Sequence, residues 1–270
     1  MHTHSRFSFD GEDELTKMLA TAYEKGVAFY GVCEHLDYDL IERGMYECPN
    51  AEEYFHEARH LQEDYAGAMN VAVGMEFGFS KEERFWEKYA TFYERYRPDY
   101  VINSVHALAG EDYYDRTPFY KKGKDGGEKS KLESYREYFE CVRASLETPY
   151  PYDIVGHFGY CTRYAPYVDR VATLAEFGEA IDGVLRRIIE LDKILEINSS
   201  NKGGVSSFLP SKEILERYFA LGGRKVSFGS DAHFCSRVGD KWAEAVALLK
   251  EIGFTCLTVP YRGEHVKVEM

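Results

Sequence analysis

The sequence predicts an α/β fold in which helices cover a parallel sheet that curves toward a closed barrel. Segments with helical periodicity alternate with short, continuously apolar segments, which is typical of a parallel sheet buried on both faces. About six or seven strand–helix units can be counted, close to the eight of a (β/α)8 barrel. No linker or short repeat divides the 270 residues, so we expect one domain over residues 1–270.

The first units follow directly from the pattern of apolar residues. A helix is expected over 13–25, where the apolar residues fall on one face and Gly26 supplies the stop. The apolar run 27–33 is the first expected strand. A helix over 50–66 then leads to a strand over 71–75. Each strand is short and apolar, as the strands of a covered parallel sheet must be.

The same alternation continues to the end of the chain. A helix over 81–96 ends before Pro98, and a strand follows over 100–105. Residues 107–130 are polar and rich in Gly and Asp, so we interpret them as an insertion. The remaining expected elements are helix 131–147, strand 153–156, helix 172–191, strand 194–198, helix 211–221, strand 225–229 and helix 241–251.

Composition and charge argue against several classes of protein. The net charge of −13 disfavours nucleic-acid binding, and the longest basic cluster (Lys121, Lys122, Lys124) is interrupted and typical of a solvated loop. We see no signal peptide and no apolar run near the roughly 20 residues of a membrane span. The six cysteines contain no CxxC pair. We therefore expect a cytoplasmic protein with reduced thiols that binds neither nucleic acid nor membranes, and no feature indicates its oligomeric state.

Residues that bind metal ions occur at seven places, each at the end of an expected strand or in the loop after it. The ends of parallel barrel strands share one rim, so residues far apart in sequence meet there. Imidazole and carboxylate groups are ligands for Zn, Mn or Fe, and nine of them exceed what one ion needs. Six of the nine histidines occupy such positions. The nine residues are His2, His4, Asp10, His35, Glu76, His106, His157, Asp231 and His233.

These motifs resemble those of the PHP (polymerase and histidinol phosphatase) family, and most closely its monofunctional histidinol-phosphate phosphatases. They appear in family order and span nearly the whole chain. The segments that carry the resemblance are His2-Thr-His4, Asp10, Glu34-His35, Gly74-Met-Glu76, Ser104-Val-His106, Gly156-His157 and Gly229-Ser-Asp231-Ala-His233. The resemblance implies a distorted (β/α)7 barrel, related to the TIM barrel, that holds a trinuclear metal site.

The resemblance also implies how the ligands are shared. Two to three divalent ions, Zn, Mn or Fe, would be bound. One ion would take His2, His4, Glu76 and Asp231. A second would share Glu76 and add His106 and His157, and a third would take Asp10, His35 and His233. Asp10 is the least typical of the nine, because some relatives carry a histidine there.

The segment from Gly156 to Tyr164 resembles the stretch in which histidinol phosphatases place a phosphate-binding arginine. Arg163 is the matching residue, and its planar fork suits phosphate oxygens. Together with Asp231 and His233, it forms the catalytic group that the resemblance implies. The implied reaction is hydrolysis of a small phosphate monoester, foremost L-histidinol phosphate, by hydroxide from water whose pKa the metals lower to about 7.

Other functions compete with this one. A phosphoesterase of the same family could act on a nucleotide, a sugar phosphate or phosphotyrosine. A non-catalytic metal-binding protein is a second alternative, but a structural zinc site is closed with about four ligands rather than nine. The segment His56-Glu57-Ala-Arg-His60 matches the HExxH pattern of zinc proteases. Its histidines are expected on the solvent side of their helix, which argues against a protease.

Four local features complete the expectations. Only Met1 precedes His2, so either the first barrel strand is almost missing or the start site is misassigned. Acidic side chains near the rim would suit the amine and imidazole of histidinol phosphate, but we favour a solvated-loop interpretation for Glu111 and Asp112. The stretch 198–201 could contact substrate or form a turn. His265 is expected to be exposed in a charged tail.

Overall fold

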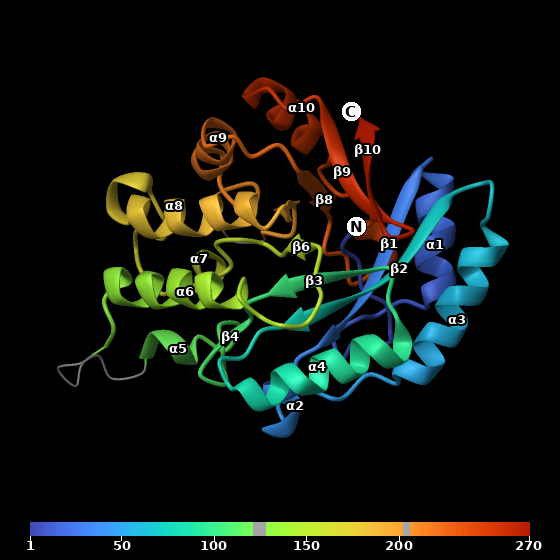
Figure 1. The fold of residues 1–270 in the computed structure, drawn as a ribbon, viewed down its shortest axis with the longest axis horizontal. Helices are drawn as coiled ribbons and strands as arrows, with labels where there is room; N and C mark the ends of the chain where they lie inside the picture. The colour runs from blue at the N-terminus through green and yellow to red at the C-terminus, as the bar shows by residue number, and fades with distance from the viewer. Residues whose placement is uncertain (121–127, 202–205) are drawn as a thin grey trace.

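Six parallel strands form one curved sheet in the computed structural model, which describes residues 1–120, 128–201 and 206–270 (Figure 1). The basic cluster at 121–124 lies outside the described residues. Neighbours in the sheet follow one another along the chain, as in a barrel built from strand–helix units. The strands, in sheet order, are β1 (Phe29–Leu36), β2 (Asn70–Gly78), β3 (Tyr100–Ser104), β6 (Ile154–Val155), β7 (Ile194–Asn198) and β8 (Val226–Gly229).

Helices surround the outer surface of this sheet (Figure 1). They are α1 (Leu15–Glu24), α2 (Tyr38–Glu42), α3 (Ala51–Asp64), α4 (Glu83–Tyr96), α5 (Thr117–Tyr120), α6 (Lys131–Ser145), α7 (Cys161–Tyr164), α8 (Leu174–Glu190), α9 (Lys212–Ala220) and α10 (Trp242–Ile252). The seven expected helices are present within about two residues of their expected bounds, and α2, α5 and α7 are short additions. Within the described ranges, no helix combines the length and apolar character needed to span a membrane.

Residues 1–4 close the sheet between its first and last strands. The carbonyl of Thr3 accepts a hydrogen bond from the backbone of Cys33 in β1 at 3.0 Å. On the other side, the backbone of His4 donates to the carbonyl of Ala232, just after β8, at 2.8 Å. The almost missing first strand is therefore a four-residue segment that bonds to both neighbours. With this segment the sheet forms a distorted TIM-like barrel of seven units.

A C-terminal hairpin that the sequence analysis did not anticipate packs beside β8. It consists of the antiparallel strands β9 (Cys256–Tyr261) and β10 (Glu264–Glu269). The expectation for His265 was wrong. This residue belongs to β10, is partly buried, and its Nδ1 lies 2.9 Å from Nζ of Lys225. Valines alternating with charged residues over 264–269 were the available strand signal.

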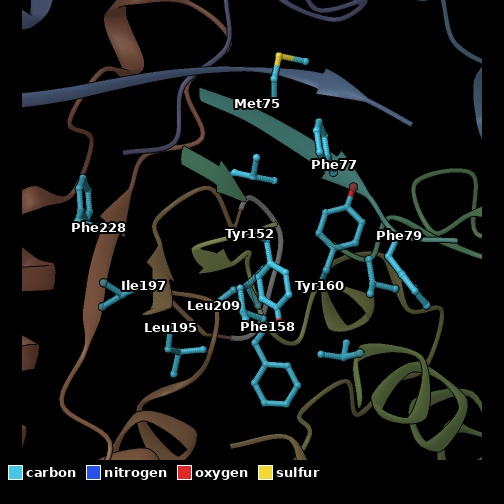
Figure 2. Close-up of a cluster of buried hydrophobic side chains, with 14 of the residues drawn as sticks. Met75, Phe77, Phe79, Tyr152, Phe158, Tyr160, Leu195, Ile197, Leu209 and Phe228 are labelled. Carbon is cyan, nitrogen blue, oxygen red and sulfur yellow. The ribbon is translucent and has the colours of Figure 1, made fainter. Parts of the chain in front are cut away.

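Side chains point alternately to the two faces of each strand and so contribute to two separate apolar cores, one between sheet and helices and one inside the barrel. Figure 2 shows Met75 and Phe77 of β2 with Leu195 and Ile197 of β7 in the core between sheet and helices. Phe77 packs on Tyr89 of α4 with 4.7 Å between ring centroids. Intervening residues point into the barrel, because successive strand side chains face opposite sides. The polar residues at the strand ends therefore project into one space inside the barrel.

Tyr100 fills the interior below that space. A Cβ atom added at Gly74 would lie 2.5 Å from the Tyr100 ring, and one at Gly31 would lie 2.5 Å from its hydroxyl. Both positions must be glycine for the ring to fit. The remaining inner core is small and apolar, with Cys33 and Ile102 among its buried members. Tyr100 therefore closes the barrel interior directly below the polar residues at the strand ends.

Candidate metal centre

Glu76, near the end of β2, lies between two pairs of histidines. Its Oε2 is 3.3 Å from Nε2 of His2 and 3.6 Å from Nε2 of His4. Its Oε1 is 3.2 Å from Nε2 of His106 and 3.0 Å from Nε2 of His157. One carboxylate therefore presents one oxygen to each pair. This is the arrangement that a carboxylate shared by two ions requires.

The two aspartates occupy the other side of the cluster. Asp231 Oδ1 is 3.4 Å from Nε2 of His4. Asp10 Oδ2 is 2.9 Å from Nε2 of His233, and its Oδ1 is 3.7 Å from Nε2 of His35. The fold therefore brings together all nine residues that the sequence singled out. Within each of the three expected ligand sets, the nearest carboxylate and imidazole atoms are 2.9–3.8 Å apart.

The register of the sheet explains this convergence. His35 of β1 is directly paired with Glu76 of β2, and both side chains point inward. Ser104 of β3, two residues before His106, donates to Glu76 Oε1 at 2.6 Å and holds the carboxylate in place. Asp231 has a φ of 48°, a left-handed conformation that Asp tolerates better than most residues. Strained backbone of this kind is concentrated at functional sites.

Several buried atoms of the cluster lack hydrogen-bond partners among the described residues. They include Nε2 of His2, Nε2 of His4 and Nδ1 of His157, whereas Nδ1 of His35 lies 2.8 Å from Oε2 of Glu76. Leaving such atoms unsatisfied costs about 1–3 kcal/mol each, so native proteins rarely do it without a further ligand. The orphaned atoms are imidazole nitrogens, and those of His2 and His4 face the carboxylates of Glu76 and Asp231. This donor set fits divalent transition metal ions.

The electrostatics of the cluster also suit cations. Burial lowers the pKa of His4 to about 3, with His35 and His233 adding to the effect, so its imidazole is neutral. Burial disfavours the carboxylate of Glu76, but the surrounding imidazoles, led by His2, hold its pKa well below its ordinary value. Burial lowers the pKa of His35, yet Glu76 and Asp10 outweigh it and raise that pKa to about 9. The cluster therefore combines an ionised carboxylate with a neutral imidazole, and both are forms that bind metal cations.

Two buried carboxylates that sequence reasoning missed orient the imidazoles. Glu196 Oε1 lies 2.7 Å from Nδ1 of His2, and Asp37 Oδ1 lies 2.8 Å from Nδ1 of His106. An ionised carboxylate only accepts, so each histidine donates from Nδ1 and keeps Nε2 for the cluster. A glutamate inside the apolar strand 194–198 was the signal that could have identified Glu196. Asp37 offered no comparable signal.

Two further residues near the rim support loops. Glu34 turns away from the cluster and accepts hydrogen bonds from the hydroxyls of Ser5 and Ser8 at 2.7 and 2.6 Å. Asn198 is buried, and its Nδ2 donates to Glu196 at 3.2 Å. Asn198 therefore supports Glu196 from within the barrel, a role that neither interpretation of residues 198–201, substrate contact or a turn, had included.

A cavity of about 470 Å³ opens beside the cluster, and Arg163 of α7 lines it. The guanidinium lies 5.1 Å from the ring centre of Tyr160 and 5.7 Å from that of Tyr164. Its Nη2 is 3.6 Å from Oδ2 of Asp231. Its Nε and Nη2 have no hydrogen-bond partner in the described part of the chain, although both are buried. Two N–H donors are therefore free to bind an anion next to the cluster.

The HExxH match on α3 is a surface feature. His56 and His60 are exposed, while Tyr54, Phe55 and Ala58 form the buried face of the helix. This is the orientation that periodicity predicted, and it is the reverse of what a zinc protease needs.

Comparisons with known proteins agree with this geometry. The PHP domain family model matches residues 1–200. The histidinol-phosphatase of Lactococcus lactis subsp. lactis is 30% identical over 253 residues, covering 94% of this chain and 90% of that protein. A crystal structure of histidinol phosphate phosphatase from the same organism, complexed with zinc, L-histidinol and phosphate, matches with a TM-score of 0.84 and 29% identity, covering 98% of this chain and 97% of that one. A structure from Listeria monocytogenes, 19% identical with a TM-score of 0.73, covers 90% of this chain and 98% of its own, and shares the fold.

Proposed function

This chain belongs to the PHP domain family, and on that basis we propose that it hydrolyses L-histidinol phosphate to L-histidinol and inorganic phosphate. One observation carries the proposal: six members of the cluster and the guanidinium of Arg163, whose Nε and Nη2 have no hydrogen-bond partner among the described residues, line a single cavity of about 470 Å³. The six are Asp10, His35, His106, His157, Asp231 and His233. The similarity to the Lactococcus lactis enzyme extends over nearly the full length of both chains. The chain is therefore a metal-dependent phosphomonoesterase.

The cluster would hold two to three divalent ions. His2, His4, Glu76 and Asp231 form one ligand set. Glu76 also belongs to a second set, with His106 and His157. Asp10, His35 and His233 form the third set. Zinc is the first choice, because the Lactococcus lactis structure contains it, and the donor set also suits manganese and iron. Bound cations of this kind neutralise phosphate charge and lower the pKa of water.

The residues of the chain position the substrate. Arg163 binds non-bridging phosphate oxygens through Nε and Nη2, the two buried donors without other partners among the described residues. Burial disfavours the charge on this guanidinium, but Asp231, Tyr160 and Tyr164 together outweigh that effect and raise the pKa of Arg163, which stays cationic. Tyr160 and Tyr164 flank it and restrict its motion. Asp37 and Glu196 keep the imidazole rings aimed at the centre.

We also propose that residues 1–270 form one domain and that the protein is cytoplasmic. All six cysteines are free thiols, which suits a reducing compartment. The net charge of −13 gives no support to a nucleic-acid partner. The substrate is accordingly a small phosphate ester.

The test combines metal analysis with turnover. Bound metals are measured by mass spectrometry, and phosphate release is measured from L-histidinol phosphate and a panel of nucleotides, sugar phosphates and phosphotyrosine. We expect two or three metals per chain and the highest kcat/KM with L-histidinol phosphate. His106→Ala should lower turnover at least about 100-fold and reduce metal content.

His60→Ala is the matched control, because His60 is exposed on α3 and lies outside the cluster. It should leave both measurements unchanged. Preference for another ester would change the assigned substrate and leave the proposed metal chemistry in place. Absence of both metal and turnover in the purified protein would contradict the proposal.

A further inference from the structure

Two carboxylates line the catalytic cavity without joining the metal-ligand cluster. They belong to Asp112 and Asp115, whereas Arg163 is the only arginine or lysine among the described residues that line it. A phosphate dianion is repelled by carboxylates and gains nothing from additional ones. The part of the substrate that meets the carboxylates of Asp112 and Asp115 must therefore differ in charge from the phosphate.

Asp112 is buried and belongs to a β-hairpin, so the solvated-loop interpretation was wrong for this residue. It is 1% exposed and lies in a small hairpin of β4 (Ala107–Leu108) and β5 (Glu111–Asp112). It pairs with Ala107, the residue that follows His106. Its Oδ1 accepts from the backbone of Tyr114 at 2.9 Å, and its Oδ2 accepts from the hydroxyl of Tyr46. The hairpin thus fixes a carboxylate beside the cluster.

Tyr46 is held from two sides. Its ring stacks on Phe9, with 3.7 Å between centroids and 18° between planes. Its hydroxyl proton is committed to Asp112, so the phenol oxygen has only lone pairs left to offer the cavity that it lines. An oxygen in this state accepts hydrogen bonds, and the carboxylate behind it strengthens its attraction for positive charge. The pair therefore selects a cationic N–H donor.

We propose that Tyr46 and Asp112 form the subsite that recognises the protonated amine of the leaving alcohol. The pair would then determine specificity for phosphate monoesters whose alcohol carries a cationic amine. This inference rests on the proposed function, since L-histidinol phosphate carries such an amine. The cavity then offers two chemically different contacts: Arg163 binds the anionic phosphate of the substrate, and the Tyr46–Asp112 pair binds its cationic amine. A neutral ester leaves the pair without a donor.

The first test compares a phosphate ester whose alcohol carries a cationic amine with one whose alcohol is uncharged. The variants Tyr46→Phe and Asp112→Asn keep the ring and the side-chain shape but remove the acceptor oxygen or the charge. With L-histidinol phosphate each should lower kcat/KM about 10- to 100-fold, the effect of losing a charged hydrogen bond. With p-nitrophenyl phosphate, which has no amine, the change should stay within about twofold. The double variant should lose little more than either single one, because the two residues act as a unit.

The second test uses the two products as separate probes of binding. By calorimetry on the metal-loaded protein, Tyr46→Phe should weaken binding of L-histidinol about 10- to 100-fold and leave binding of inorganic phosphate unchanged. Tyr23→Phe is the control, because Tyr23 is exposed on α1 and outside the cavity. It should match the wild type with both ligands.

The outcomes separate this inference from the proposed function. Equal losses with both substrates would show that the pair only maintains the cavity, and no loss with either would show that it is not used. Both results overturn the inference. If the wild type prefers another amine-bearing ester, the proposed function fails. The inference still stands provided that Tyr46→Phe lowers kcat/KM for that ester relative to kcat/KM for p-nitrophenyl phosphate.

Discussion

The hydroxyl of Tyr100 lies 2.5 Å from the carbonyl oxygen of Met1 and donates a hydrogen bond to it. The same hydroxyl is 3.1 Å from the carbonyl of Val32 in β1. A side chain from β3 therefore crosses the barrel interior and supports the segment that carries His2 and His4. The position of these two ligands depends on a residue that contacts no metal site directly.

Tyr100→Phe should lower the free energy of unfolding by about 1–2 kcal/mol, because the carbonyls of Met1 and Val32 lose the buried hydroxyl that donates to them. It should also weaken zinc binding, measured by calorimetry on protein freed of metal with a chelator. Tyr54→Phe is the control, because its hydroxyl donates to Gly74 at 2.8 Å from α3, on the helix side of the sheet. It should cost similar stability and leave zinc affinity unchanged; equal affinity losses in both variants would contradict the role of Tyr100.

Asp37→Asn should weaken metal binding about 10- to 100-fold, because His106 loses the carboxylate that holds its Nδ1 proton. Turnover should fall in proportion, and added metal should restore part of it. Asp39→Asn is a close control, since Asp39 is also buried but accepts from the backbone of Leu40. If Asp37→Asn binds metal as tightly as wild type, Asp37 does not position His106.

Asp39 should make stability depend on pH. Burial, aided by Asp37, raises its pKa from 3.8 to about 6 in the folded protein. The folded state therefore holds this proton more tightly than the unfolded state, and its contribution to stability declines as pH rises from about 4 to 6. Asp39→Asn should raise the free energy of unfolding by about 1–3 kcal/mol at pH 7.5 and change it little at pH 4. Urea unfolding at both values measures this difference; a loss of stability at both would contradict it.

Arg163→Gln should weaken binding of inorganic phosphate about 10- to 100-fold, because two charged N–H donors are lost. Arg163→Lys should recover only part of the loss, since an ammonium keeps the charge without the fork. Binding of L-histidinol should not change in either variant. Calorimetry with the two products measures this, and an equal loss for both would place Arg163 in the support of the cavity.

Sequence reasoning located the helices and the cluster because both leave local signals. Apolar periodicity and stops such as Gly26 fixed the long helices, and histidines after apolar runs identified the rim. The ends of β1 and β2 were placed too early, because His35 and Glu76 are polar residues inside strands and their inward direction is set by the sheet. Short elements such as α2 carry too few residues for a period to be visible.

The supporting contacts could not be predicted because they join distant residues. Tyr46 and Asp112 are 66 positions apart, and nothing in either segment indicates the other. The same holds for Glu196, which is 194 positions from His2 along the chain. Such pairs exist only once the sheet has closed.

The closure by residues 1–4 has a consequence for the order of events during synthesis. The backbone of Asp231 donates to the carbonyl of His2 at 2.8 Å, so the first ligand set unites the two ends of the chain. Contacts of such long sequence separation form late, because the intervening chain must be ordered first. A ribosome-bound chain that lacks β8 can offer His2 and His4 but cannot complete their shared site. The ligand set of His2, His4, Glu76 and Asp231 should therefore bind its ion tightly only after β8 and Asp231 have been synthesised.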